Sequence, residues 1–110
     1  MAKPNAAFMS SVPELVVLRL LSDREMYGYE LVKAIRLASN ERLTPAEGVI
    51  YPLLHSLEQR GHLKSVKRQV LGRNRIYYRT TSTGKKQLQG LTAEWRRITK
   101  ALTSIIGESV

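Results

Sequence analysis

The chain has 110 residues and no cysteine, so it has the size of one small domain and lacks disulfides, thiolate catalysis and Cys-ligated metals. Hydrophobic residues make up 43% of the sequence and charged residues 25%, which is typical of a folded domain and not of a disordered chain. No apolar stretch approaches the ~18 residues of a membrane span, and residues 1–9 do not resemble a secretory signal. We therefore expect a cytoplasmic protein with no membrane partner.

The net charge of +9 is concentrated in one segment of the chain. Residues 1–58 sum to −1, whereas residues 59–93 carry nine basic side chains and no acidic one. Solvated protein surfaces normally mix the two signs, so a block of this kind indicates a polyanionic partner, most often a nucleic acid. Apolar side chains such as Val66 and Ile76 are interleaved with these charges, which argues against a disordered basic tail.

Two helices are predicted in the first part of the chain. Residues 11–14, Ser-Val-Pro-Glu, have the pattern of a capping box with proline in the first turn, and the apolar run 15–21 follows them. This pattern predicts a buried helix of about ten residues that begins at Ser11. Residues 28–31 open a second helix, whose apolar side chains recur every three or four residues up to a terminator at Asn40.

A third helix is predicted to begin at Thr44 and to end at Gly61. Residues 44–47, Thr-Pro-Ala-Glu, again have the pattern of a capping box, with proline at the first helical position. The apolar residues between positions 50 and 57 recur at i, i+3, i+4 and i+7, so they form one buried stripe and leave the opposite side of the helix exposed.

The basic segment predicts a β-hairpin. Residues 63–69 and 75–80 are typical of two strands, joined by a loop over residues 70–74 that contains Gly72 and Asn74. In the second strand, basic residues alternate with mostly apolar ones. Because successive side chains of a strand point to opposite sides, we expect one mostly apolar face and one basic face.

A long fourth helix is predicted to begin near Thr81 or Ser82. It is expected to be ~25 residues and ~37 Å long. Its apolar residues alternate at spacings of three and four, which is the seam of a coiled coil. The seam consists of Leu88, Leu91, Trp95, Ile98, Leu102 and Ile105. Because three short helices and a hairpin cannot cover its far end, we expect the five seam residues from Leu91 onward to form a homodimer interface.

This order of elements predicts a mainly α fold with a small β-hairpin, namely a winged helix-turn-helix followed by a long C-terminal dimerisation helix. Residues 1–110 are expected to form a single domain, with the winged helix-turn-helix over residues 10–80 and the dimerisation helix over residues 81–108. In this fold the third helix enters the major groove of double-stranded DNA, and the hairpin, called the wing, contacts the backbone or the minor groove.

Candidate DNA-binding residues follow from this plan. On the wing they are Lys67, Arg68, Arg73 and Arg75, which would contact phosphates or the minor groove and position the protein without reading sequence. On the non-core side of the third helix they are Thr44, Ala46, Glu47, Tyr51 and His55, as candidates for base readout. Two of them have an alternative role, because Tyr51 is also interpreted as a packing tyrosine and Glu47 as part of the capping box.

Neither a metal site nor a catalytic site is predicted. The two histidines, His55 and His62, lie seven residues apart with no acidic cluster around them, and a metal site needs three or four ligands. The nine acidic residues are scattered and form no Ser/His/Asp or paired-carboxylate arrangement. We therefore expect a protein that is not an enzyme and that needs no cofactor.

Several short motifs occur along the chain in a fixed order. They are Gly28-Tyr29-Glu30-Leu31, Gly48-Val49-Ile50-Tyr51-Pro52-Leu53-Leu54, Leu57-Glu58, Gly61-His62-Leu63, Gly72-Arg73, Arg75, Tyr77-Tyr78, Thr81 and Gly84. Together they resemble the PadR-like transcriptional regulators of prokaryotes. The chain departs from the family pattern at Ile76, where a basic residue is usual, and at Thr80, where leucine is usual. We expect the first change to weaken backbone contact and the second to loosen the packing of the wing.

The resemblance implies a DNA-binding repressor of the short subgroup, in which a single C-terminal helix forms the homodimer that binds a roughly palindromic operator. Some relatives bind aromatic or drug-like compounds between the subunits, and Trp95 is similar to their stacking tryptophan. With Trp95, the candidate residues of such an effector pocket are Phe8, Leu15 and Ile98. A packing role for Trp95 in the seam stays open, as do the existence of an effector and the direction of its effect.

Two other classes of protein are kept as alternatives. A small basic RNA-binding or ribosome-associated protein fits the size and the charge, although RNA-binding proteins commonly expose aromatic side chains for base stacking and Tyr77 is the one obvious candidate. A protein-interaction module would keep the winged-helix fold without binding DNA, but the basic segment argues against it. Competition between duplex DNA and structured RNA distinguishes the first alternative from a DNA-binding regulator.

Overall fold

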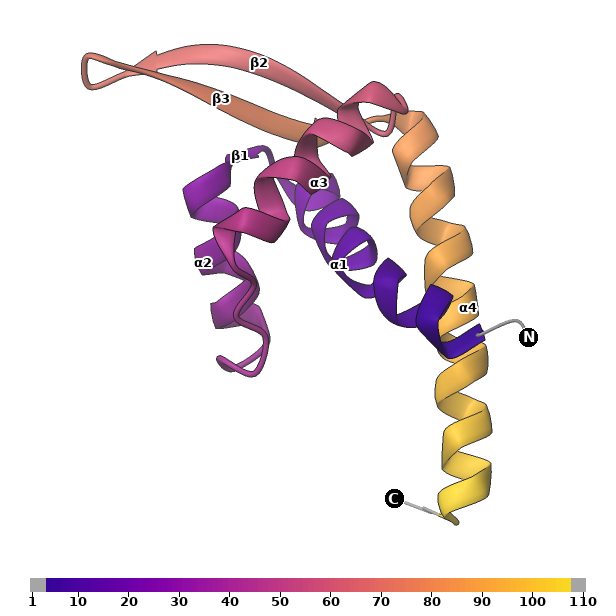
Figure 1. Ribbon diagram of the computed structural model, residues 1–110. Helices are drawn as coiled ribbons and strands as arrows, with labels where there is room; N and C mark the ends of the chain where they lie inside the picture. Colours follow the sequence, from indigo (N-terminus) through magenta and orange to yellow (C-terminus); the bar gives the residue numbers. More distant parts are fainter. Residues whose placement is uncertain (1–3, 108–110) are drawn as a thin grey trace.

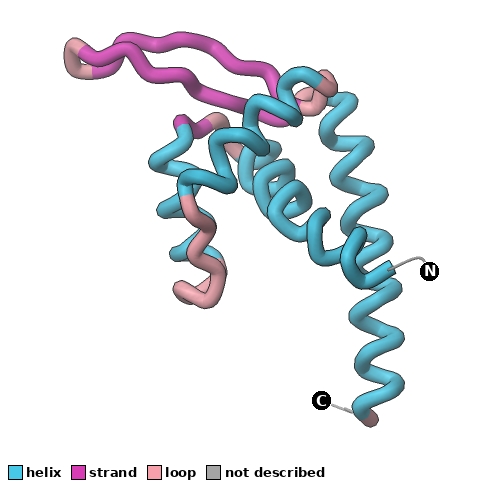
Figure 2. The backbone as a smooth tube through the Cα atoms, viewed as in Figure 1, coloured by secondary structure: helices cyan, strands magenta, loops and turns pink. Residues whose placement is uncertain are grey.

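The computed structural model describes the backbone of residues 4–107 and the side chains of residues 11–107. It is elongated, measuring 54 × 28 × 25 Å, and mainly helical (Figures 1 and 2). The elements are α1 (Pro4–Asp23), β1 (Met26–Tyr27), α2 (Gly28–Ala38), α3 (Glu47–Gln59), β2 (Leu63–Val70), β3 (Arg73–Thr80) and α4 (Ser82–Ile106). The predicted fold class, a winged helix-turn-helix with a long last helix, is confirmed.

Helix α1 lies at the centre of the fold, because it contacts α2, β3 and α4. Its side chains Val17, Leu18 and Leu21 are completely or almost completely buried. Burial of a large aliphatic side chain contributes roughly 1.5–3 kcal/mol, so this helix is a main source of stability. The other elements complete the buried apolar core with Met26, Leu31, Ile35, Ile50, Leu54, Leu57, Leu63, Tyr78 and Leu88.

Helix α1 begins earlier than predicted, at Pro4 rather than at Ser11. The capping-box interpretation of residues 11–14 is therefore wrong. Pro4 accounts for the earlier start, because proline is favoured in the first turn of a helix and no glycine or other proline follows until Pro13. Pro13 lies inside the helix, where it lacks a backbone donor, and the helix continues through it to Asp23.

Helix α3 begins at Glu47 with Ala46 as its N-cap, so the predicted capping box at Thr44 is also wrong. Residues 43–46 have no regular secondary structure. The backbone N–H of Leu43 donates a hydrogen bond to Oγ of Ser39 at 2.9 Å, and the first helical hydrogen bonds of α3 run from Val49 and Ile50 to the carbonyl of Ala46. The contact with the end of α2 therefore holds this segment outside the helix, against the local pattern.

The strand β1 was not among the predicted elements. It pairs antiparallel with β3, so that Met26 lies opposite Tyr78 and Tyr27 lies opposite Tyr77. The sheet therefore has three strands in the order β1-β3-β2. Because Met26 is buried in the core and α2 begins directly after Tyr27, β1 fixes the start of α2 to the base of the wing.

Strands β2 and β3 form the wing, which extends away from the helices (Figure 1). Their pairing continues to Val70 opposite Arg73, so the connection is the two-residue turn Leu71-Gly72 and not the predicted loop over residues 70–74. Both turn residues have positive φ, +52° for Leu71 and +78° for Gly72, which is the pattern of a type I′ turn. Glycine adopts this conformation freely, whereas for leucine it costs about 1–2 kcal/mol.

Two threonines fix the base of the wing. Thr80 is buried and donates a hydrogen bond to the backbone carbonyl of Leu18, with an Oγ1···O distance of 2.8 Å. The expectation that Thr80 loosens the wing is therefore wrong, because its hydroxyl holds β3 on α1. Thr81 caps α4, since its Oγ1 accepts a hydrogen bond from the backbone N–H of Gly84 (3.0 Å) and donates one to the carbonyl of Gly61 (2.7 Å).

Gly84 allows α4 to lie directly on the base of the wing. A Cβ atom at this position would lie 2.1 Å from the carbonyl oxygen of His62 and 2.7 Å from Cγ2 of Thr80. The same His62 carbonyl accepts a hydrogen bond from the backbone N–H of Thr81 at 3.1 Å. A glycine is therefore required here, and the base of the wing and the first turn of α4 form one packed junction.

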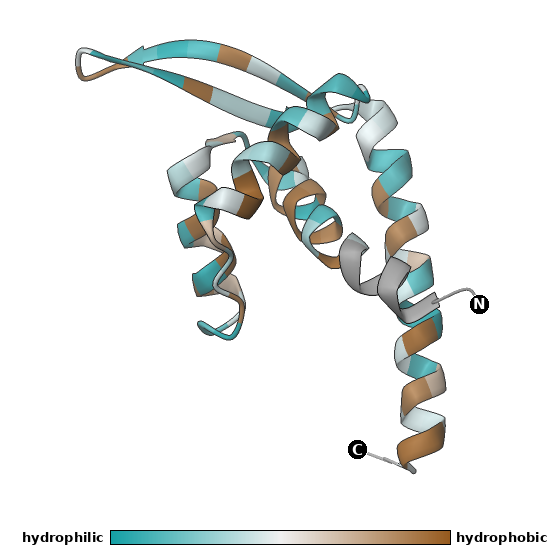
Figure 3. Cartoon of the chain, in the orientation of Figure 1, coloured by the Kyte–Doolittle hydropathy of each residue, from teal (hydrophilic) through white to brown (hydrophobic). Residues whose placement is uncertain are grey.

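Helix α4 has its predicted start and length of 25 residues. Its first part packs on α1, with Leu88 buried and Leu91 partly buried. The last turns of α4 extend beyond the rest of the fold and are rich in hydrophobic residues (Figure 3), and Ile105 is 81% exposed. Along the described part of the chain, no helix is long and apolar enough to cross a membrane.

Candidate nucleic-acid interface

The register of the wing sorts its cations onto two sides. Side chains that lie opposite each other in neighbouring strands share a side of the sheet, and successive side chains alternate. Five cations share one side, here called the basic face: Lys64, Arg68, Arg73, Arg75 and Arg79. Lys67 lies opposite Ile76 on the other side, which continues into the core. Of the four wing residues predicted to bind DNA, three are therefore brought together and Lys67 is not.

Two cations of the basic face are held by other side chains. Arg68 forms an ion pair with Glu25 (Nη2···Oε1 2.7 Å), and its guanidinium lies 5.8 Å from the ring centroid of Tyr77. The guanidinium of Arg75 lies 4.4 Å from the ring centroid of Tyr27. Contacts of this kind orient a guanidinium before any ligand arrives. Four cations of the face form no ion pair within residues 11–107: Lys64, Arg73, Arg75 and Arg79.

A row of aromatic side chains continues the basic face toward α2. The ring of Tyr27 meets Tyr77 edge to face at a centroid distance of 5.4 Å and stacks with Tyr29 at 6.5 Å. The Lys33 ammonium lies 5.7 Å from the centroid of Tyr29. Sequence analysis missed Tyr27, Tyr29 and Lys33 as members of this surface. The placement of β1 beside β3 brings them there, and a strand of two residues has no periodicity that would reveal it.

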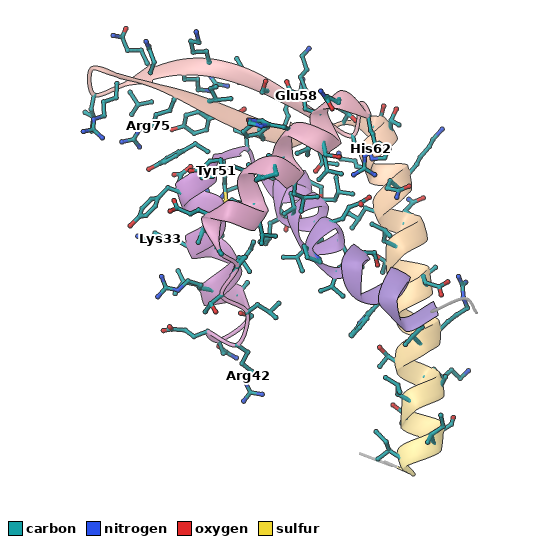
Figure 4. The ribbon with its side chains drawn as sticks, in the orientation of Figure 1. Lys33, Arg42, Tyr51, Glu58, His62 and Arg75 are labelled. Atoms are coloured by element: carbon teal, nitrogen blue, oxygen red, sulfur yellow. The ribbon has the colours of Figure 1, made fainter. Side chains whose placement is uncertain are left out.

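Tyr51 joins the exposed side of α3 to the start of α2. A Cβ atom on Gly28 would lie 2.5 Å from Cε1 of Tyr51 and 2.8 Å from its hydroxyl oxygen, so the ring packs directly on this glycine. The side chain is nevertheless 39% exposed. Tyr51 thus combines a packing contact with a surface that a ligand can reach. Tyr51, Lys33 and Arg75 lie on the same side of the molecule (Figure 4).

The other predicted readout residues are exposed around the start and outer side of α3. Thr44 precedes the helix, Ala46 is its N-cap and Glu47 is its first residue. Glu47 does not complete a capping box with Thr44, but its carboxylate lies in the first turn, where the helix dipole stabilises a negative charge. His55 follows Tyr51 by one turn, so its exposed side chain extends the same side of the helix.

Tyr78 lies on the core side of the wing. Its burial raises the pKa of the hydroxyl above the ordinary value of 10.0, and the charges of Glu58 and of ionised Tyr51 raise it further. The neutral phenol is therefore the stable form. Glu58, toward the C-terminal end of α3 (Figure 4), accepts a hydrogen bond from the hydroxyl of Ser65 on β2. The hydrogen bond between Ser65 and Glu58 fastens α3 to the wing.

A cavity of about 380 Å³ lies between α1, α4 and Leu43. Leu15 and Trp95, two of the four predicted effector residues, line it together. Ile98 is not among the residues that line it in the described part of the chain, and the side chain of Phe8 lies outside the described residues. The volume falls within the range of small-molecule pockets, roughly 300–1,000 Å³.

The two histidines do not form a common site. His55 is exposed on α3, whereas Nδ1 of His62 is buried near the junction of the wing and α4, without a hydrogen-bond partner among the described residues (Figure 4). No group of three or more His, Asp or Glu side chains within residues 11–107 could hold a metal ion.

With this geometry in place, the chain can be compared with known proteins. The model of the family described as "Transcriptional regulator PadR-like family" matches residues 17–90, from the buried part of α1 through the whole wing and into α4. The chain belongs to the PadR-like family. It is therefore a DNA-binding transcriptional regulator, and the resemblance seen in its motifs is confirmed.

Individual relatives agree with membership of the PadR-like family. The transcriptional regulator Rv3488 of Mycobacterium tuberculosis is 32% identical over 100 residues, covering 91% of this chain and 88% of that protein. The transcriptional regulator YqjI of Escherichia coli is 39% identical over 62 residues, which are 56% of this chain but 30% of that longer protein. The structure of a transcriptional regulator from Clostridium thermocellum matches with a TM-score of 0.79 at 29% identity, over 90% of this chain and 96% of that one.

Proposed function

We propose that this chain is a transcriptional repressor that binds a roughly palindromic operator as a homodimer. In this proposal α3 of each subunit enters the major groove, and the basic face of each wing contacts the neighbouring backbone and minor groove. The observation that carries the proposal is the basic face, because five cations share one side of a hairpin that extends from the recognition helix. Lys67 lies outside this face and is expected to contribute less than Arg73.

Sequence readout is assigned to the exposed start and outer side of α3. The side chains that would reach base edges there are Thr44, Ala46, Glu47, Tyr51 and His55. A carboxylate next to DNA needs a donor, so Glu47 is expected to accept a hydrogen bond from a cytosine amino group. Tyr51 is held by its packing on Gly28, which favours a fixed contact with a phosphate or a sugar.

The exposed seam of α4 supports a second copy of the chain as the protein partner. Trp95, Leu102 and Ile105 are large apolar side chains on the exposed surface of this helix. Pairing with the same helix of another subunit buries them, and the two-fold symmetry of such a dimer repeats the DNA-binding surface. The two half-sites are then expected about one helical turn apart, ~34–36 Å.

Selection of duplexes from a random pool tests this proposal. The selection uses the full chain at ~150 mM salt with an excess of non-specific competitor DNA. The proposal expects enrichment of a motif with two-fold symmetry. Failure to enrich any motif, or preferential binding of structured RNA in direct competition, would overturn it.

Replacement of Arg73 tests the role of the basic face on the selected operator. We expect R73A to weaken specific and non-specific duplexes alike and to reduce the slope of log affinity against log salt by about 2, because a dimer loses one phosphate contact in each subunit. The measurement is a salt titration of binding by fluorescence anisotropy, and K67A on the opposite side of the wing is the matched control. A change in the preferred sequence without a change in affinity would contradict this assignment.

We further propose that the cavity beside Trp95 receives a small aromatic or drug-like effector. Its apolar side chains, including Leu15 and Leu91, and its position at the dimerisation helix support this role. Because Trp95 is the single tryptophan of the chain, its fluorescence reports binding directly. Titration with a panel of aromatic and cationic compounds is expected to quench it, and the absence of quenching by the whole panel would contradict the proposal.

A further inference from the structure

The tip of the wing carries an apolar side chain that does not contribute to the core. Leu71 is 95% exposed, more than any other large apolar residue between positions 11 and 107. Single apolar side chains at a surface are common and by themselves indicate nothing. The backbone distinguishes Leu71, because its φ of +52° is a conformation that leucine rarely adopts.

The local chemistry of the turn favours a different residue. The first position of a type I′ turn is normally Asn, Asp or Gly, which accept positive φ with little strain. Gly72, at the second position, follows this preference, whereas Leu71 does not. Leu71 therefore strains the turn and gains no burial within the chain. A side chain of this kind is explained by a contact that forms with another molecule.

The surroundings of Leu71 indicate what that molecule is. Arg73 lies two residues away on the basic face and forms no ion pair within the described residues, and Arg75 and Arg68 follow toward the base of the wing. The tip thus presents one apolar side chain at the end of a cationic hairpin. In the minor groove, ~6 Å wide, proteins commonly combine cations on the phosphates with a leucine or another apolar side chain placed against a base step.

We propose that Leu71 is an apolar wedge that enters the minor groove of duplex DNA and partly unstacks the base step beneath the tip of the wing. The proposal rests on the DNA-binding function of the wing and goes beyond it, because the wing then deforms the DNA as well as neutralising the charge of its phosphates. Flexible pyrimidine–purine steps, TA or CA/TG, cost least to unstack. The wing is therefore expected to select these steps outside the bases that α3 reads.

The variant L71N tests the wedge alone, because it removes the apolar side chain and leaves the charge of the wing unchanged. Asparagine tolerates positive φ, so the fold is expected to keep or increase its thermal stability. We expect L71N to bind the selected operator about tenfold more weakly, with an unchanged salt slope because no cation is lost. L71M, which keeps an apolar side chain, is expected to retain most of the affinity, and R73A provides the contrasting case of a reduced slope.

A fluorescent base locates the wedge. The probe is 2-aminopurine, placed in turn at each step of the operator flanks, and its fluorescence rises when it is unstacked. The wild-type chain is expected to raise the signal at one step in each flank, and L71N is expected not to. Equal affinity of L71N and wild type, or no 2-aminopurine signal with wild-type protein bound, would overturn the wedge while leaving the repressor proposal intact. A wild-type chain that binds no duplex would instead overturn the repressor proposal.

Discussion

Arg68 and Arg75 lie opposite each other on the wing, but they differ in how they are held. Arg75 is held by the ring of Tyr27, which leaves its charge uncompensated, whereas Arg68 is paired with the carboxylate of Glu25 at 2.7 Å. An exposed ion pair of this kind contributes only about 0–1 kcal/mol to stability. We propose that its larger effect is on DNA binding, because Glu25 would compete with phosphate for Arg68.

Replacement of Glu25 tests this competition. We expect E25Q to bind duplex DNA severalfold more tightly and to increase the salt slope by up to about 2, because Arg68 of each subunit becomes available to a phosphate. Salt titration of binding measures both quantities. E41Q is the matched control. Glu41, in the segment between α2 and α3, is also an exposed carboxylate, and it pairs with Arg36 of α2. An equal effect of both variants would show that only net charge matters.

The raised pKa of Tyr78 determines how the free energy of unfolding is expected to change at alkaline pH. Burial, with smaller effects of Glu58 and Tyr51, raises its pKa in the folded state above the 10.0 of an ordinary tyrosine. Between these two pKa values the unfolded chain binds fewer protons than the folded one, so the free energy of unfolding falls as the pH rises past about 10.

We expect Y78F to flatten this alkaline loss of stability, because it removes the group that must ionise on unfolding. Urea unfolding between pH 8 and pH 11 measures the effect, and Y29F, which changes an exposed tyrosine, is the control. A Y78F profile as steep as that of the wild type would mean that another group controls the alkaline transition.

Replacement by alanine is expected to have opposite effects on stability at two glycines of α4, Gly84 and Gly90. Alanine at Gly84 brings a Cβ atom to 2.1 Å from a backbone carbonyl oxygen, so the junction must open and G84A is expected to lose about 1–3 kcal/mol. A Cβ atom at Gly90 meets no atom within 4 Å among the described residues, and G90A is expected to gain about 0.5–1 kcal/mol of helix propensity. Thermal unfolding of both variants measures the difference, and a stable G84A would contradict the close packing of α4 on the wing.

The elements that sequence analysis located best are those with a long periodic signal. Helix α2 and helix α4 begin where their patterns predict, and β2 begins at Leu63 as expected. The starts of α1 and α3 were wrong, because a Ser or Thr three residues before Glu is compatible with a cap but does not require one. At α1 the helix already begins at Pro4, and at α3 the N-cap is Ala46.

The candidate site was predictable in its charge but not in its arrangement. The alternation within β3 placed Arg75 and Arg79 on one side of the strand. Assigning Lys64 and Arg68 to the same side, and Lys67 to the other, requires the pairing register, which depends on a turn of two residues rather than five. The contributions of Tyr27 and Glu25 depend on β1, which is too short to have a pattern.

The exposed seam of α4 sets the expected assembly state of the molecule. Leu102 lies in the seam and is about half exposed, so a charge at this position should prevent two copies from pairing. We expect L102E to reduce the mass in solution from twice the chain mass to the 12.5 kDa of one chain, and to weaken operator binding strongly. Light scattering after gel filtration measures the mass.

The control for L102E is T103E, which adds the same charge one position outside the seam. It is expected to remain dimeric. If the wild-type chain has the mass of a single copy at micromolar concentration, the seam does not hold two subunits together and the palindromic operator loses its structural basis.

Because the base of the wing and the first turn of α4 are packed and hydrogen-bonded as one unit, the two elements turn together. Each strand of the wing has eight residues, which corresponds to about 27 Å at ~3.4 Å per residue. A rotation of α4 by about 10° therefore carries the tip of the wing through an arc of about 5 Å. If α4 joins two subunits as proposed, a small change in the angle between the subunits is therefore expected to produce a larger displacement of the wing across the DNA.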